Sequence, residues 1–198
     1  RAAGPDAPDD ATTRLMRETI EGRLLAEEEI VSILRNWTVG ELGTIAASVG
    51  ILMHYLAEHP ELQKRLRAHP TAQPDAIDEI LRIHAPLIAN RRITTCPVHI
   101  GDRQIDAGER VTILWAAANR DEAVFRDPDH FDPERNRERN LLYGAGLHVC
   151  PGAPLARMEL QLLLRALLDA TQAIEPVTAQ PPVSAHFPAS GFDQLTLR

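Results

Sequence analysis

Apolar residues recur along most of this chain with the spacing of a helix, which predicts a mainly helical protein. The longest such run opens with three glutamates, is strongly apolar in its second half and stops at Pro60. Because acidic residues favour the positive end of a helix and proline stops one, we expect a single long helix over residues 25–60. Shorter helices are expected over residues 11–21, 60–70 and 74–86, and from Leu155 onward.

Other segments lack the helical pattern. Residues 91–115 read as short strands that turn at Gly101-Asp102 and Ala107-Gly108. Residues 119–140 are rich in Asp, Pro and Arg and have almost no apolar periodicity, and long irregular stretches of this kind in compact domains are usually functional. The tail from Ile174 should form short strands and loops. The predicted fold class is therefore mainly α with small β-sheets (α+β).

Composition narrows the function classes. The 198 residues suffice for one sizeable core, and a formal charge of -7 argues against nucleic-acid binding. With two cysteines, Cys96 and Cys150, there is no disulfide framework, which suits a reducing cytoplasm. The most apolar run, residues 45–57, is too short to span a bilayer, so we expect no membrane partner.

The first residues suggest a piece of a longer protein. The chain starts with Arg1, and residues 1–10 are rich in Pro, Ala and Asp without periodicity. We expect this segment to be a flexible lead-in or a cut point.

Cys150 has an unusual setting near the C-terminus. Three glycines, Gly144, Gly146 and Gly152, surround it, so the backbone can bend and another group can approach closely. A helix follows, and a thiol just before a helix N-terminus meets unpaired N–H groups and the positive end of the dipole, which favour thiolate. Such a thiolate is a nucleophile or a metal ligand.

Four segments, in order along the chain, resemble the cytochrome P450 family. Tyr143-x-x-Gly146-x-His148-x-Cys150-x-Gly152 is similar to the family's haem-binding loop, with Tyr143 where the family usually has phenylalanine. Glu79-Ile80-Leu81-Arg82 is similar to its Glu-x-x-Arg helix, and Phe131–Arg135 to the segment before the haem loop. The long glycine-containing helix resembles the one that crosses the distal face of the haem. All four belong to the second half of the family's domain, which implies that residues 11–198 are the C-terminal half of a cytochrome P450-like haem domain.

The resemblance implies haem b (iron protoporphyrin IX) as the cofactor and Cys150 as the thiolate ligand of its iron. Thiolate donation raises electron density at the iron and favours O–O cleavage. A buried structural thiol, a zinc ligand and a hydrolytic pair with His148 are weaker alternatives, because no second Cys-x-x-Cys pair exists and His148 belongs to the same turn. The implied cofactor-binding residues are Cys150, His148, Arg92, Tyr143, Gly144, Gly146 and Gly152.

Arg92 and His148 are implied as partners of the haem propionates, which suits the charge-assisted bonds that arginine makes with carboxylates. Arg91 lies beside Arg92, so the register of this arginine is open by one residue, and a solvated arginine pair is the alternative.

The resemblance also places Glu79, Arg82 and Arg135 in a buried ion network on the proximal side of the haem. Its role would be structural, because a buried charge left without its partner costs about 3–5 kcal/mol. An exposed pair on a helix face is the alternative for Glu79.

The long helix departs from the family pattern. Thr44 stands sixteen residues before Pro60, where the family has its oxygen-activating threonine. The family usually has Asp or Glu just before that threonine, and here the residue is Gly43. Glu41, three residues before Thr44, is a candidate substitute acid or a solvated side chain.

The leading functional hypothesis is a haem-thiolate monooxygenase that inserts one atom of O2 into a small organic substrate. Its electrons would come from a ferredoxin or flavin-type donor that docks over the cysteine face. A peroxide-using or rearranging haem-thiolate protein is the alternative within enzymes, and a non-catalytic haem-binding remnant is the alternative outside them. We also expect a partner that completes the fold, either the missing N-terminal half or another copy of the chain.

Overall fold

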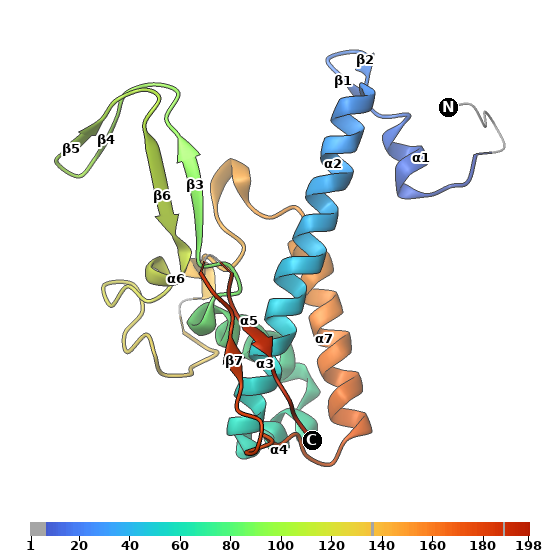
Figure 1. The fold of residues 1–198 in the computed structure, drawn as a ribbon, viewed down its shortest axis with the longest axis vertical. Coiled ribbons are helices and arrows are strands. Elements are labelled where there is room, and N and C mark those ends of the chain that lie inside the picture. The colour runs from blue at the N-terminus through green and yellow to red at the C-terminus, as the bar shows by residue number, and fades with distance from the viewer. Residues whose placement is uncertain (1–6, 136, 188) are drawn as a thin grey trace. The chain divides into compact units, whose positions relative to one another are not determined.

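The computed structural model of this protein describes residues 7–135, 137–187 and 189–198, in which helices dominate and strands are short (Figure 1). The predicted fold class is confirmed. By its internal contacts the chain divides into two compact units, Arg1–Gly43 and Thr44–Arg198. Most of the predicted lead-in, residues 1–6, lies outside the described residues.

The first unit begins with a helix shorter than predicted. Helix α1, Ala11–Leu15, is capped by Asp10, whose side chain accepts from the Thr13 N–H at 2.8 Å. The prediction of a helix over residues 11–21 is wrong after Leu15, because strands β1 (Thr19–Ile20) and β2 (Arg23–Leu24) follow as a hairpin. Glu21 and Gly22, with φ of 50° and 78°, form its two-residue turn, a conformation that a helix excludes.

The long predicted helix is present, with one irregularity. It consists of α2 (Glu27–Val39), a π-helical segment (Gly40–Ile45) and α3 (Ala46–Glu58), and α4 begins at Pro60 as expected. A π-helical turn bonds residues five apart instead of four, so the spacing at which side chains share a face changes there. Such turns are frequent at functional sites.

Residues Glu27–Glu58 also form the one helix within the described ranges that is long and apolar enough to cross a membrane. The sequence-based expectation rested on the shorter run 45–57 and did not include this longer segment. A single such helix is weak evidence, because the core helix of a soluble protein passes the same test.

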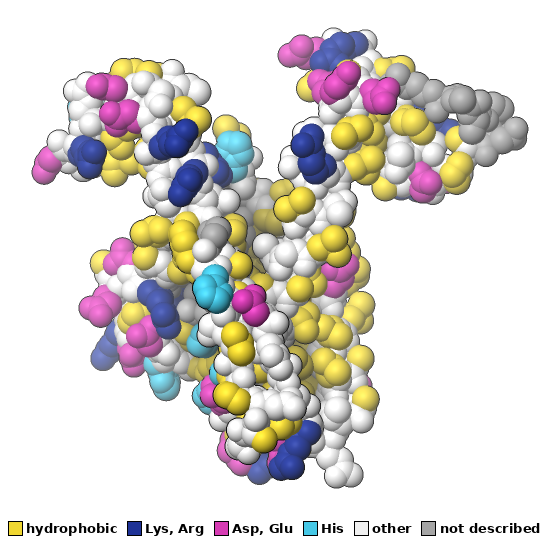
Figure 2. Space-filling view, in the orientation of Figure 1, with side chains coloured by type: hydrophobic (Ala, Val, Ile, Leu, Met, Phe, Trp, Pro, Cys, Tyr) yellow, Lys and Arg dark blue, Asp and Glu magenta, His cyan; other side chains and the backbone are white. Residues whose placement is uncertain are grey.

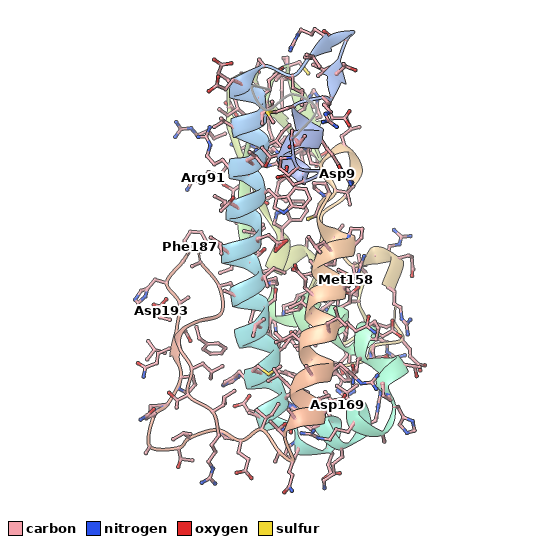
Figure 3. All side chains as sticks on the ribbon, turned by 90° about the vertical axis from the view of Figure 1, so that its right-hand side faces the viewer. Asp9, Arg91, Met158, Asp169, Phe187 and Asp193 are labelled. Carbon is pink, nitrogen blue, oxygen red and sulfur yellow. The ribbon has the colours of Figure 1, made fainter. Side chains whose placement is uncertain are left out.

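Helices α3, α4 (Pro60–Ala68), α5 (Gln73–His84) and α7 (Ala153–Ala170) build the core of the second unit. Prolines stand in the first turns of α4, α5 and α7, and α5 ends before Pro86. Both views show α7 running beside α3 (Figures 1 and 3). The buried apolar residues that pack together in this core are Ile51, Leu52, Met53, Leu56, Ala57, Leu66, Ala76, Ile77, Ile80, Leu81, Leu160, Leu164, Leu168 and Ile174.

The strands of the second unit form small antiparallel pairs. Strand β3 (Ala89–Ile93) pairs with β6 (Arg110–Leu114), and β4 (Val98–Ile100) pairs with β5 (Arg103–Ile105). The predicted turns are confirmed, since β4 and β5 join at Gly101 and Asp102, and Gly108 has a φ of 86°. The short helix α6 (Trp115–Ala118) follows β6, and strands β7 (Val183–Ser184) and β8 (Phe192–Gln194) pair in the tail.

The segment that lacked periodicity is irregular here too. Between α6 and α7 the described residues hold two short 3-10 turns, Arg137–Arg139 and Gly146–His148. The stretch between α6 and α7 carries most of the candidate site residues.

Candidate functional site

The residues singled out around Cys150 form one loop, residues 143–152, which we call the cysteine loop. Cys150 is a free, exposed thiol. Its backbone N–H donates to the Tyr143 carbonyl at 2.8 Å, which closes the loop on itself. Gly144 and Gly146 have φ of 72° and 68°, a left-handed conformation that residues with a Cβ adopt only at a cost. The glycines therefore determine the shape of the loop.

Gly152 links the thiol to the helix that follows. It is the N-cap of α7, and a Cβ added to it would lie 3.8 Å from the Cys150 sulfur. The thiol thus precedes the first turn of an 18-residue helix, where the helix dipole favours negative charge.

Tyr143 anchors the start of the cysteine loop to two helices. The guanidinium carbon of Arg157, on α7, lies 4.4 Å from the centroid of the Tyr143 ring, within cation–π range. Arg157 is in turn paired with Asp78 of α5, with 2.9 Å between Nη2 and Oδ2. Burial of the Tyr143 hydroxyl, reinforced by the negative charge of Asp78, raises its pKa well above the usual value.

Sequence reasoning selected Tyr143 but missed Asp78 and Arg157. The position of Asp78 next to Glu79 was a weak signal. Arg157 gave none, because nothing local shows that it lies over an aromatic ring.

Glu79, Arg82 and Arg135 lie together in the structure. Arg82 donates from Nε to Glu79 Oε2 at 2.7 Å and from Nη2 to Oε1 at 2.9 Å. Arg135 Nε lies 3.8 Å from Glu79 Oε1. The side chains of Arg82 and Glu79 are 1% and 5% exposed, so this is a buried ion network and not a surface pair.

The two arginines also hold the irregular segment in place. Arg82 donates to the carbonyls of Asn119 (2.6 Å) and Pro128 (2.8 Å). Arg135 donates to the carbonyls of Arg126, Asp127 and His130. The buried Asn119 side chain accepts from the Leu141 N–H at 2.8 Å, which connects the network to the approach of the cysteine loop. Sequence reasoning missed Asn119, a polar residue at the end of the apolar run Trp115–Ala118.

Arg92 and His148, the two candidate partners of the propionates, are both exposed. Arg92 lies on β3 opposite Val111, and its guanidinium donates to the Arg91 carbonyl at 2.9 Å. Successive strand residues point to opposite faces, so the side chains of Arg91 and Arg92 lie on opposite sides of the β3–β6 pair. Figure 2 shows dark blue side chains over this pair, which carries Arg91, Arg92 and Arg110. His148 ends the 3-10 turn inside the cysteine loop.

Thr44 and Glu41 lie in the π-helical segment Gly40–Ile45. The Thr44 carbonyl accepts from the buried Ser48 hydroxyl at 2.7 Å. The expectation that Glu41 lies beside Thr44 assumed α-helical spacing, and the π-helical pitch changes that register. A Cβ added to Gly43 would meet no atom within 4 Å, so space does not dictate glycine there.

The chemistry of these residues suits haem. An exposed thiol in a glycine loop can approach a flat ligand, and a Cβ at Gly146 would meet nothing within 4 Å. The Arg92 guanidinium and the His148 ring can each donate a hydrogen bond to a carboxylate. Among the described residues no group of three or more His, Cys, Asp or Glu side chains could hold a bare metal ion, so a single thiolate would need the haem to complete the coordination.

Comparison with solved structures defines the fold. The structure of the cytochrome P450 TbtJ1 matches all of this chain and 53% of its own, with a TM-score of 0.91 and 31% identity. CYP109E1 from Bacillus megaterium, solved with testosterone, matches 94% of this chain and 52% of its own, with a TM-score of 0.87 and 28% identity. The fold is that of a haem-thiolate protein.

Sequence comparison agrees. Residues 74–191 match the family model "Cytochrome P450", and the chain belongs to the cytochrome P450 family, whose cofactor is haem. It is 37% identical to the cyclomarin C epoxidase CymV of Salinispora arenicola over 173 residues. This matching stretch covers 87% of this chain and 44% of that protein. It is 40% identical over 135 residues to 20-oxo-5-O-mycaminosyltylactone 23-monooxygenase of Streptomyces fradiae, covering 68% and 32%. The chain thus spans less than half the length of these curated relatives.

Proposed function

We propose that the protein containing this chain is a haem-thiolate monooxygenase acting on an organic substrate. The observation that carries the proposal is the cysteine loop, in which two left-handed glycines and a bond from the Cys150 N–H to Tyr143 present a free thiol before α7. Haem, when bound, would supply oxygen activation: O2, two electrons and two protons are consumed, one oxygen atom goes to the substrate and the other leaves as water.

The residues of this chain would divide the work. Cys150 holds the iron, while Tyr143, Gly144, Gly146 and Gly152 give its loop the necessary shape. Arg92 and His148 bind the propionates. Glu79, Arg82 and Arg135 hold the irregular segment against α5 and so support the loop from behind. Thr44 would take part in proton delivery, and Glu41, in the same π-helical segment, is the candidate substitute acid.

The proposal includes partners and a compartment. Electrons come from a ferredoxin or flavin-type donor, and two free, exposed cysteines suit the reducing cytoplasm. The printed names of the relatives differ in substrate, from cyclomarin C to a tylactone derivative, so we carry none of them over.

We further propose that this chain is the C-terminal half of the haem domain and that an N-terminal half completes it. The support is twofold. The relatives are more than twice as long as the stretch that matches. On α7 the apolar side chains Met158 and Leu162, one turn apart, are 51% and 62% exposed, a face that needs a partner.

A second candidate function is a peroxide-using or rearranging haem-thiolate reaction. Gly43, in place of the usual acid, favours it, because such reactions depend less on proton delivery from the distal helix.

The ligand assignment is tested by exchanging each cysteine for serine. In the haem-loaded protein, Cys150→Ser should abolish the thiolate signature of the reduced carbon-monoxide difference spectrum, because a serine hydroxyl is not a thiolate donor. Cys96→Ser is the matched control, since Cys96 is also a free, exposed thiol, and it should leave the spectrum intact. A thiolate spectrum retained in Cys150→Ser would refute the assignment.

A further inference from the structure

A small cavity lies between α5 and four residues of the segment that leads to the cysteine loop, Pro133, Arg135, Arg137 and Asn140. The space open to the centre of a water molecule is about 40 Å³. A water needs roughly 10–15 Å³ on this measure and two to four polar partners, so the cavity has room for at least one.

Two of the residues that line this cavity each have a buried side-chain atom without a hydrogen bond to any described residue, Asp78 Oδ1 and Arg135 Nε. Arg135 Nε is 3.8 Å from Glu79 Oε1 and 3.6 Å from Asp132 Oδ2, which is ion-pair range but too long for a hydrogen bond. One atom is a donor and the other an acceptor. A water between them would satisfy both, and an unsatisfied buried group is costly.

The charges around the cavity favour a neutral occupant. Three carboxylates and three guanidiniums line it, and they largely pair with one another, as in Arg137–Asp75 at 2.7 Å and Arg82–Glu79 at 2.7 Å. Because their formal charges sum to zero, the cavity has no net charge that would attract a cation or an anion. The lining charged residues are Asp75, Asp78, Glu79, Arg82, Arg135 and Arg137.

We propose that this cavity is a water-binding site whose water accepts a hydrogen bond from Arg135 Nε and donates one to Asp78 Oδ1. Through this water the Glu79–Arg82–Arg135 network continues to Asp78. The other oxygen of Asp78 accepts from Arg157 Nε at 3.0 Å, and Arg157 covers the ring of Tyr143.

This chain of contacts makes Asp78 and Arg157 positioning residues for the cysteine loop. The Tyr143 carbonyl accepts a hydrogen bond from the Cys150 N–H, so a shift of Tyr143 would move the backbone of the cysteine directly. The water site itself depends only on the fold, and its effect on haem rests on the proposed function.

The direct test is a crystal structure of the haem-loaded protein at a resolution that shows ordered waters. We expect a water within hydrogen-bond distance of both Arg135 Nε and Asp78 Oδ1. A cavity without such a water, with Arg135 Nε turned to bond directly to a carboxylate, would overturn the proposal. This test needs no activity, so its failure is distinguishable from failure of the monooxygenase assignment.

The second test measures the consequence for the cysteine loop. Asp78→Leu removes the acceptor of the water and the partner of Arg157, and we expect backbone amides of residues 143–150 to exchange hydrogen about 10- to 100-fold faster, the effect of losing hydrogen bonds to a charged group. Haem should be lost to an acceptor protein faster in the same variant. Exchange in the loop at the wild-type rate would refute the positioning role.

Two further variants keep the test interpretable. Asp169→Leu removes the partner of Arg165 from an exposed pair near the end of α7, away from Met158 near its start (Figure 3), and it should leave the loop unchanged. Asp78→Asn keeps an oxygen acceptor and nearly the same volume, so its crystal structure should retain the water even where Asp78→Leu does not fold. Loss of the water in Asp78→Asn would contradict its assignment to the side-chain oxygen.

Discussion

Gly43 is the residue at which the long helix departs from the pattern that the resemblance implies. It lies in the π-helical segment immediately before Thr44, and a Cβ there would meet no atom within 4 Å. Packing within this chain therefore does not require glycine at this position. Under the proposed role of Thr44 in oxygen activation, the acid that usually precedes this threonine is missing, so the protons must come from another group or the reaction must not need them.

Restoring the acid tests which of these holds. In the complete enzyme, Gly43→Asp should raise the fraction of electrons that ends in product, since a well-placed general acid contributes up to about 10²–10⁴-fold. The measurement is product formed per reduced cofactor consumed. Glu41→Gln should lower the same ratio because it removes the substitute acid. If neither variant changes the ratio, the proton-relay role of this segment is wrong.

The start of helix α2 depends on one carboxylate. Glu29 accepts from Arg23 Nη1 and Nη2, both at 2.8 Å, and from the Ala26 N–H at 2.7 Å. The bonds from Arg23, and secondarily the one from Ala26, lower the pKa of Glu29 from 4.5 to about 2. The hairpin β1–β2 and the first turn of α2 are therefore joined through this side chain.

This arrangement predicts a pH dependence with a definite sign. Because the folded-state pKa of Glu29 is depressed, its contribution to stability is present above pH 4.5 and is lost as the pH falls from there through about 2. The protection factors of the amides of residues 27–30, which compare measured exchange with the intrinsic rate at each pH, should fall as the pH is lowered from 6 through that window. Glu29→Gln should show low protection throughout and no such step. An identical pH profile in this variant would exclude Glu29 as the cause.

Exposure of apolar side chains differs sharply between the two parts of the long helix. Among the described residues of α2, Ile30 alone is buried, whereas α3 buries Ile51, Leu52, Met53, Leu56 and Ala57. Within α2 the side chains of Trp37 and Val39 are 55% and 68% exposed. Apolar surface of this extent is typical of an interface that a further part of the protein covers.

We expect that the 198-residue chain alone does not form a stable, closed haem pocket. Several hundred Å² of uncovered apolar surface, at about 25 cal/mol per Å², forfeits on the order of 10 kcal/mol, comparable to the stability of a whole domain. Size-exclusion chromatography with light scattering should show association of the chain alone and a defined complex with a matching N-terminal half.

Three outcomes are distinguishable in that measurement. A haem-loaded complex of one chain with one N-terminal half supports the proposal. A haem-loaded homodimer would mean that another copy covers the surface instead. A well-folded, haem-loaded monomer of this chain would refute the prediction.

Features that depend on residues close together in the chain could be predicted from the sequence. A proline acts within one turn of a helix start, which is why α4, α5 and α7 lie where their patterns indicated. Glycine alone adopts positive φ cheaply, so the bend of the cysteine loop was also predictable. The helix predicted through residue 21 was wrong because the turn at Glu21-Gly22 outweighs a weak helical pattern.

Features that depend on residues distant in the chain became visible in the folded molecule. The resemblance singled out Glu79, Arg82 and Arg135, but the partners Asn119, Asp78 and Arg157 have no local signature. Asp78 and Arg157 are 79 residues apart, and their ion pair exists because α5 and α7 pack in the same core. Whether a side chain is buried, and which charged group it pairs with, depends on which residues come together in space. The periodicity of residues along the chain does not encode those long-range contacts. For the same reason, the cysteine loop could be predicted from consecutive residues. The cavity and the ion network behind that loop depend on how the helices pack, so they became visible in the folded structure.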